Sequence, residues 1–408
     1  MREMCLYTAA HLWWHIIATY LSRKGSRNAF DEQRQSGQAA WNMGLLCGQG
    51  AEDPRFDQGP TVTCSDNAAY HASRVDPEAV AQILVLMFRD LLDRRLFDGA
   101  RLFNRWYRVV LDGTVKEKCR QGHERGGKSA TQGARYRYVL QASVAGPAGT
   151  LWPLMHEEMD VRNPVLDKED CELAAFARLS ARLKKEFPRL PICLVADALY
   201  CCQAVVVKCK QFDWKYVLTL KEGRQPTTWD ETLRLLPLHR ANRLRCLLGQ
   251  DGGEGLRDFR WVENVLLGEH QTNVVLQGEI RAHPPSATLY AYITNYPNLT
   301  PARVAALVHS GGRKRHLIED AFNTQKNNGI GLEHVFCANA TASKNYYTMM
   351  QVAQILWTLT CQGGLRRLYD WARRATQQGL ARAVWEGLRA ARLPPDLPPL
   401  GQLRFSSD

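Results

Sequence analysis

Two apolar runs that each end in an aspartate constrain the fold of this chain more than any other feature. The run Tyr107–Leu111 ends at Asp112, and the run Pro191–Ala196 ends at Asp197. Both runs have the length of a strand and lack the alternation of a half-exposed one, so we expect central strands buried on both faces. Open α/β sheets place their binding sites at the carboxyl ends of such strands. The two aspartates are therefore candidates for a single site.

A third acidic residue, Glu319, lies between two basic residues in a segment with helical spacing. Arg315, Glu319 and Lys326 follow the pattern R-x3-E-x6-K. Since steps of four and seven residues return to the same face of a helix, the three side chains share one face. The carboxylate can hold Mg²⁺ while the cations hold phosphates, which suits metal-assisted chemistry on a phosphodiester. Asp320 lies about 100° further around the helix and is the weaker candidate.

These residues, in this order, resemble the DDE transposases of bacterial insertion sequences. More narrowly, they are similar to the group whose last carboxylate lies in the signature Y-x2-R-x3-E-x6-K. Arg315, Glu319 and Lys326 match that signature, whereas Gly312 stands at its tyrosine position. The likeness covers about residues 105–360. Its other fragments are Leu111–Thr114, Lys168–Glu172, Ala196–Tyr200, Trp214–Leu220 and Phe322–Lys326.

The resemblance implies a catalytic triad of Asp112, Asp197 and Glu319 that holds Mg²⁺, with Mn²⁺ as the alternative ion. It implies DNA as the partner, both transposon ends and target DNA, bound by a homodimer in the synaptic complex. The implied location is the bacterial cytoplasm, in association with the nucleoid. The residues expected to contact DNA are Arg125, Lys128, Arg313, Arg315 and Lys326.

The resemblance also implies an α/β fold, with a ribonuclease-H-like mixed sheet, flanking helices, a β-rich insertion and a helical N-terminal region. In that sheet the first and fourth strands lie side by side, which would bring Asp112 near Asp197. The expected order of elements over residues 105–220, βββαβα, agrees with it. We expect a helical region at 1–104 that could bind DNA ends, a catalytic domain at 105–220 and 300–360, an insertion at 221–299 and a basic tail at 361–408.

Local patterns place the individual elements. Asp76-Pro77 and Thr300-Pro301 each begin a helix, because aspartate and threonine cap helix N-termini and proline fits the first helical position. The stretch 48–74, rich in Gly, Asp, Ser and Pro, is expected to be irregular. Strands are expected at 136–144, 151–158, 215–220, 243–248, 256–267, 273–280 and 288–294, and further helices at 167–187, 200–211 and 345–359.

Charge and hydropathy indicate a class of partner. The chain has 53 basic and 41 acidic side chains, a formal net charge of +12 and a pI of about 9.2, which favours a polyanionic partner without identifying it. Basic side chains are concentrated in residues 113–140 and 361–408. Residues 5–21 carry no Asp, Glu, Lys or Arg, but they are short for a membrane span, so we expect an amphipathic core helix and no membrane association.

Two other site types are weaker interpretations of the sequence. Cys119 with His123, and Cys201-Cys202 with Cys209, lack the paired C-x2-C spacing of a structural zinc site. Gly122–Ser129 matches G-x4-G-K-[ST], the phosphate loop of many nucleotide hydrolases. A true phosphate loop leaves a buried strand and opens a helix, whereas this one follows charged residues and precedes a strand-like segment.

An inactive or domesticated transposase that only binds DNA is the main alternative to an active enzyme. The presence of all three acidic residues, Asp112, Asp197 and Glu319, argues for catalysis. The resemblance therefore implies metal-dependent DNA strand cleavage and strand transfer.

Overall fold

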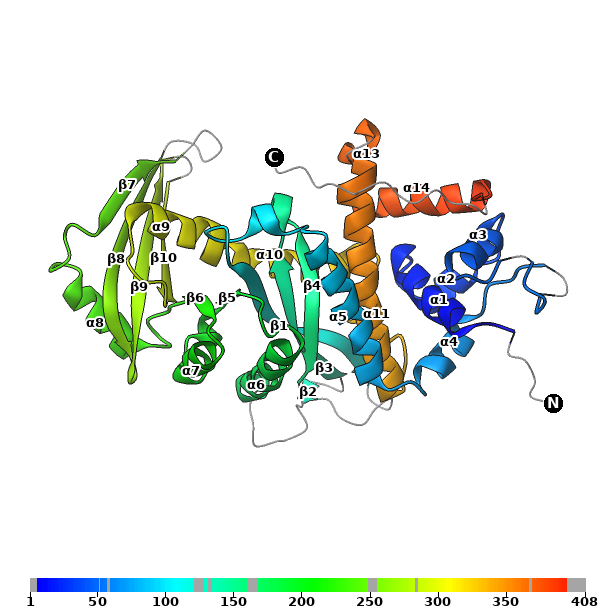
Figure 1. Cartoon of the computed structure of the whole chain (residues 1–408), viewed down its shortest axis with the longest axis horizontal. Helices are drawn as coiled ribbons and strands as arrows, with labels where there is room; N and C mark the ends of the chain where they lie inside the picture. Colours follow the sequence, from blue (N-terminus) through cyan, green and yellow to red (C-terminus); the bar gives the residue numbers. More distant parts are fainter. Residues whose placement is uncertain are drawn as a thin grey trace.

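The computed structural model describes residues 6–50, 52–56, 59–120, 128–130, 134–159, 168–248, 255–282, 285–366 and 369–394. The molecule is mixed α/β, with helices around a large mixed sheet (Figure 1). The sheet order is β2-β3-β1-β5-β6-β10-β9-β8-β7, and β4 pairs with β3. The strands are β1 Tyr107–Arg120, β2 Lys128–Ala130, β3 Ala134–Ala145, β4 Leu151–Glu158, β5 Ile192–Ala196, β6 Lys215–Thr219, β7 Arg243–Leu247, β8 Gly255–Leu267, β9 His270–Arg281 and β10 Ser286–Thr294.

The two apolar runs form adjacent parallel strands in the middle of this sheet. β1 pairs with β5 from Tyr107↔Ile192 to Val110↔Val195, and β5 pairs in parallel with β6. All five residues of β5 are at most 1% exposed. The prediction of buried central strands is therefore confirmed.

β1 differs from the expected short strand, because it continues beyond Asp112 to Arg120, paired with β3. This continuation is charged yet buried: Lys116 and Glu117 are 3% and 4% exposed. Lys116 forms an ion pair with Glu158, and Glu117 pairs with Arg137 at 3.0 Å. Paired charges thus replace apolar side chains in this half of the strand.

Helices pack on the strands of the sheet. α6 (Lys168–Glu186) packs on β3 and β4, and α10 (His316–Asn327) packs on β1 and β4. α10 buries Ile318 and Phe322. Further helices are α5 Pro77–Asp93, α7 Gln203–Gln211, α11 Ala340–Thr358 and α14 Gln377–Ala390 (Figure 1).

The N-terminal region is helical, as expected. It contains α1 Ala9–Leu21, α2 Arg27–Asp31, α3 Ala39–Leu46 and α4 Ser65–Ala72, so the stretch 48–74 is not wholly irregular. α1 packs against α4 and α11 and buries His11, His15 and Ile16, as a core helix does. None of the helices in the described part of the chain combines the length and the apolar character that crossing a membrane requires.

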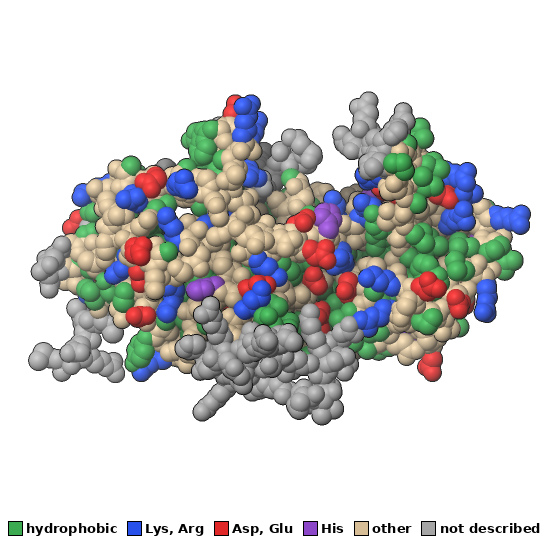
Figure 2. All heavy atoms as spheres, turned by 180° about the vertical axis from the view of Figure 1, so that it is seen from behind, with side chains coloured by type: hydrophobic (Ala, Val, Ile, Leu, Met, Phe, Trp, Pro, Cys, Tyr) green, Lys and Arg blue, Asp and Glu red, His purple; other side chains and the backbone are tan. Residues whose placement is uncertain are grey.

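The segment between β6 and α10 contributes strands to the same sheet. β10 pairs with β6 in antiparallel register, Tyr292↔Thr219, and β9, β8 and β7 follow outward. α8 (Pro226–Leu235) packs on β8. Figure 2 shows hydrophobic side chains gathered on the end of the molecule that these outer strands form, whereas lysine and arginine side chains are spread over the whole rear face.

A short irregular region leads from the outer strands into α10. α9 (Pro301–Ala306) is followed by a π-helical turn at Leu307–Gly311 and a 3₁₀ turn at Gly312–Arg315. Thr300 caps α9 through its side chain, as the sequence predicts. Gly311 and Gly312 lie at the junction of these two turns, a few residues before Arg315 and Glu319.

Candidate active site

Asp112 and Asp197 occupy equivalent positions on the two central strands. The last parallel pair of β1 and β5 is Val110↔Val195, and each aspartate follows its member of that pair by two residues. Each carboxylate is oriented by its own backbone: Asp112 accepts a hydrogen bond from Gly113 N at 3.0 Å, and Asp197 from Leu199 N at 2.9 Å. Both side chains line one cavity of about 220 Å³.

Glu172 is a third carboxylate at this cavity, and the sequence interpretation did not assign it to the site. It lies on α6, is 6% exposed, and accepts a hydrogen bond from the Tyr200 hydroxyl at 2.8 Å. Gly113 makes room for it, because a Cβ at position 113 would lie 2.7 Å from Glu172 Oε2. Nothing in the local spacing marks Glu172, since only the packing of α6 against the sheet brings it to Asp112.

The carboxylates act on one another electrostatically. The pKa of Asp112 is raised to about 7, mainly by burial; the charge of Arg315 lowers it, and the negative charges of Glu172, Asp197 and Glu319 contribute to the rise. A carboxyl group in such surroundings binds a proton readily and gains from any nearby cation. The edge of the sheet at which the parallel pairing of β1 and β5 ends, next to Asp112 and Asp197, therefore carries a cluster of negative charge.

Glu319 is near this edge but is engaged elsewhere. Its side chain is 47% exposed, and its Oε1 lies 2.6 Å from Arg315 Nη2 one helical turn earlier. Its charge raises the pKa of Asp112, yet Glu319 is not among the residues that line the cavity. Within the described residues, no three Asp, Glu, His or Cys side chains are grouped closely enough to hold a metal ion.

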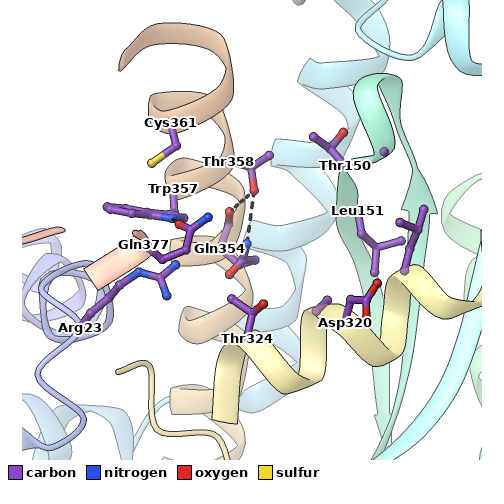
Figure 3. Close-up of a pocket in the computed structure, with 13 residues that line it drawn as sticks. Arg23, Thr150, Leu151, Asp320, Thr324, Gln354, Trp357, Thr358, Cys361 and Gln377 are labelled. Carbon is purple, nitrogen blue, oxygen red and sulfur yellow. Dashed lines mark hydrogen bonds between the residues drawn. The ribbon is translucent and has the colours of Figure 1, made fainter. Parts of the chain in front are cut away.

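Asp320 belongs to a different surface of α10. Together with Thr324 it lines a second cavity of about 220 Å³, between α10 and α11. Figure 3 shows Asp320 and Thr324 on α10, with Gln354 and Trp357 facing them from α11. The two neighbouring acidic residues thus serve different surfaces, in agreement with the helical spacing.

The basic residues expected to contact DNA differ in how they are held. Arg313 pairs with Glu279 at 3.4 Å and stacks on the ring of Tyr290 at 4.4 Å. Lys326 pairs at 2.9 Å with Glu333, which also pairs with a lysine of β1. Arg313 therefore connects the turn before α10 to the sheet, and Lys326 connects α10 itself to the sheet.

The remaining expected contacts lie at or beyond the limits of the described residues. Arg125 lies outside them, and the structure describes the backbone of Lys128, in β2, but not its side chain. Residues 122–127 of the phosphate-loop motif also lie outside. The motif's last two residues belong to a strand rather than a helix.

The sequence interpretation missed two cations at this cavity. Lys221 and Arg224 line the same cavity as Asp112 and Asp197. They stand in the turn after β6, which Gln225 ties to the loop after Asp197 by donating to Cys201 O at 2.7 Å. The cavity therefore has an acidic wall from β1, β5 and α6 and a basic wall from this turn.

One cavity thus brings together the ligand type that a divalent cation prefers and two side chains that can bind an anion. Carboxylate oxygens are the ligands that Mg²⁺ prefers, and cations on the opposite wall can receive phosphate oxygens. Comparison of the chain with protein-family models and with curated proteins gave no match.

Proposed function

We propose that this protein is a DDE-type DNA transposase, which cleaves DNA strands and joins them to target DNA with Mg²⁺ as cofactor. The observation that carries the proposal is the equivalent placement of Asp112 and Asp197, each two residues beyond the last parallel pair of β1 and β5, at a cavity that Lys221 and Arg224 also line. Nucleases and polynucleotidyl transferases need this combination of metal-binding carboxylates and phosphate-binding cations.

The strand order supports a ribonuclease-H-like catalytic core. β4, β3, β1, β5 and β6 lie side by side in that sequence, with β3 antiparallel to both of its neighbours β1 and β4, and with β5 and β6 parallel to β1. β1 and β5 correspond to the first and fourth strands of the expected order βββαβα. Their adjacency is what the resemblance implies. The core would comprise residues 105–220 and 300–360, with 221–299 as a β-rich insertion.

The acidic edge fits Mg²⁺. The raised pKa of Asp112 reflects its burial first and the nearby carboxylates second, and oxygen ligands suit this hard ion. Asp112 and Asp197 would hold the ions together with Glu319, once Glu319 exchanges Arg315 for metal. When bound, a pair of Mg²⁺ ions activates the attacking oxygen and stabilises the leaving oxygen of an in-line displacement at phosphorus.

The chain's own residues position the DNA. Lys221 and Arg224 receive phosphate oxygens on one side of the carboxylates, and Arg315 receives them on the side of α10. In the first reaction, water attacks phosphorus and the P–O3′ bond breaks, which leaves a 3′-hydroxyl. In the second, that hydroxyl attacks a phosphodiester of the target strand and displaces its 3′ oxygen.

Mg²⁺-dependent nicking of supercoiled plasmid tests the proposal. We expect the purified protein to nick the plasmid with Mg²⁺ and not with EDTA. Asp112→Asn and Asp197→Asn should each reduce nicking to background, while affinity for duplex DNA persists because phosphate contacts supply most of it. Full nicking by either variant would remove that residue from the site.

A protein that binds DNA without cleaving it is the second candidate. Glu319 forms an ion pair with Arg315 and does not form a metal site with the other carboxylates of the described residues, which favours this candidate. Salt-sensitive DNA binding by the wild type, without any Mg²⁺- or Mn²⁺-dependent nicking, would select this candidate over the enzyme.

A further inference from the structure

A tyrosine from the outer strands occupies the space beside Gly312. A Cβ built at Gly312 would lie 2.3 Å from Cε1 of the Tyr292 ring, which real side chains do not tolerate. Yet Gly312 has φ −55° and ψ −41°, a backbone conformation that any residue adopts. Glycine stands here because the ring of Tyr292 fills the place of its side chain.

Tyr292 is held firmly in this position. It lies on β10 between two strands, opposite Thr219 of β6 and Val275 of β9. Its side chain is 5% exposed. Two residues earlier on the same face of β10, Tyr290 supports the guanidinium of Arg313. β10 thus supports the turn Gly312–Arg315 with two neighbouring aromatic rings.

The hydroxyl of Tyr292 is available to a ligand. Within the described residues it makes no hydrogen bond, and it is not among the enclosed polar atoms that lack a partner, so it reaches the surface. Burial raises the pKa of Tyr292 to about 12, so the phenol keeps its proton at neutral pH and can donate it in a hydrogen bond. Cζ of Tyr292, the carbon that carries this hydroxyl, would lie 2.6 Å from a Cβ at Gly312, so the hydroxyl lies beside the turn Gly312–Arg315.

We propose that Tyr292 is a substrate-binding residue whose hydroxyl donates a hydrogen bond to the DNA phosphate that Arg315 binds. The inference rests on the proposed function. Gly312 stands at the tyrosine position of the signature that this chain otherwise matches from Arg315 to Lys326. In three dimensions, a phenol from β10 fills that place instead. A phenol and a guanidinium side by side form two donors for the oxygens of one phosphate.

Removal of the hydroxyl alone tests this role. Tyr292→Phe keeps the ring over Gly312, so the fold should be unchanged. Because a hydrogen bond to a charged group contributes about as much as a tenfold change in rate, we expect single-turnover plasmid nicking to fall roughly tenfold. The matched control is Tyr290→Phe, the same change two residues away on the same face, which should leave nicking within about twofold.

A second test moves the tyrosine from position 292 to position 312 instead of only removing its hydroxyl. Gly312→Tyr alone should lose activity and stability, because its side chain meets the ring of Tyr292. Combined with Tyr292→Ala, it should recover thermal stability and part of the nicking, since the phenol then stands on the neighbouring backbone. Recovery of stability without any nicking above Tyr292→Ala alone would contradict the proposal.

The outcomes separate this inference from the proposed function. Wild-type protein that fails to nick plasmid with Mg²⁺ or Mn²⁺ removes the proposed function and the inference with it. Wild-type protein that nicks, together with a fully active Tyr292→Phe variant, removes the inference alone and leaves Tyr292 as a packing residue.

Discussion

The edge of the sheet and the face of α10 hold their charges in opposite ways. At the edge, Asp112, Asp197 and Glu172 crowd around one cavity, and the pKa of Asp112 rises to about 7. On α10, Glu319 and Lys326 each have a partner of opposite charge within 3 Å. The edge is therefore prepared to receive cations, whereas the helix has neutralised its charges in advance.

The difference indicates how the proposed site would assemble. The strand carboxylates are fixed by the sheet and cannot move apart, and the charge of Arg315 offsets the rise in the pKa of Asp112 only in part. Glu319 is exposed and paired through a surface contact of the kind that contributes little. Metal would bind first at the edge and then recruit Glu319, while Arg315 would turn to a phosphate.

The largest expected effect concerns stability at the edge. The pKa of Asp112 is about 7 in the folded chain and 3.8 for the ordinary group, so the stability that its proton provides is complete below about pH 4 and lost as the pH rises through 7. Without Mg²⁺ at pH 8, Asp112→Asn should therefore be more stable than wild type by up to about 4 kcal/mol, at about 1.4 kcal/mol per pKa unit.

Urea unfolding from pH 4 to pH 8, in EDTA and in Mg²⁺, measures this effect. We expect the advantage of Asp112→Asn to grow with pH in EDTA and to shrink when Mg²⁺ stabilises the wild type. Parallel pH profiles for the two proteins would show that the edge is not electrostatically strained, and the contrast with α10 would disappear.

A smaller effect is expected from crowding at the same edge. In Gly113→Ala, the new methyl group would displace Met159 or the carboxylate of Glu172, at a cost of about 1–3 kcal/mol in the free energy of unfolding. Gly278→Ala is the matched control, since a Cβ there meets only Asp258 O at 3.8 Å. Equal unfolding midpoints for the two variants would contradict the close packing of Glu172 against β1.

The smallest effect is expected on α10. Arg315→Gln frees Glu319 from a surface pair that contributes about 0.3–0.5 kcal/mol, so the Mg²⁺ concentration for half-maximal nicking should fall about twofold. The maximal rate should also fall, because a phosphate contact is lost. Arg94→Gln, which breaks the exposed i,i+4 pair with Asp90 on α5, should change neither quantity. A higher Mg²⁺ requirement in Arg315→Gln would mean that Arg315 positions Glu319 instead of competing for it.

The central strands and α10 could be predicted because local patterns encode them. The unbroken apolar run Pro191–Ala196 identifies a buried strand, and the face of α10 follows from its spacing. The second half of β1 was missed, because Lys116 and Glu117 look exposed in sequence and are buried only through partners on other strands.

The candidate site could be predicted only in part. Asp112 and Asp197 follow from their strands. Glu172, Lys221 and Arg224 reach the cavity only through packing of α6 and of the turn after β6, which no local pattern encodes. The substitution of Tyr292 for a side chain at Gly312 joins residues on two separate elements, and only their packing shows it.

The pairing of β10 with β6 has a mechanical consequence. It links the outer strands to the central strands β6 and β5 through one continuous backbone ladder, instead of through a hinge. Any load that a bound molecule places on β7 or β8 is carried through β9, β10 and β6 to β5, the strand that ends next to Asp197. The outer strands thus form a stiff arm, and the tension on it is transmitted to the position of a single carboxylate.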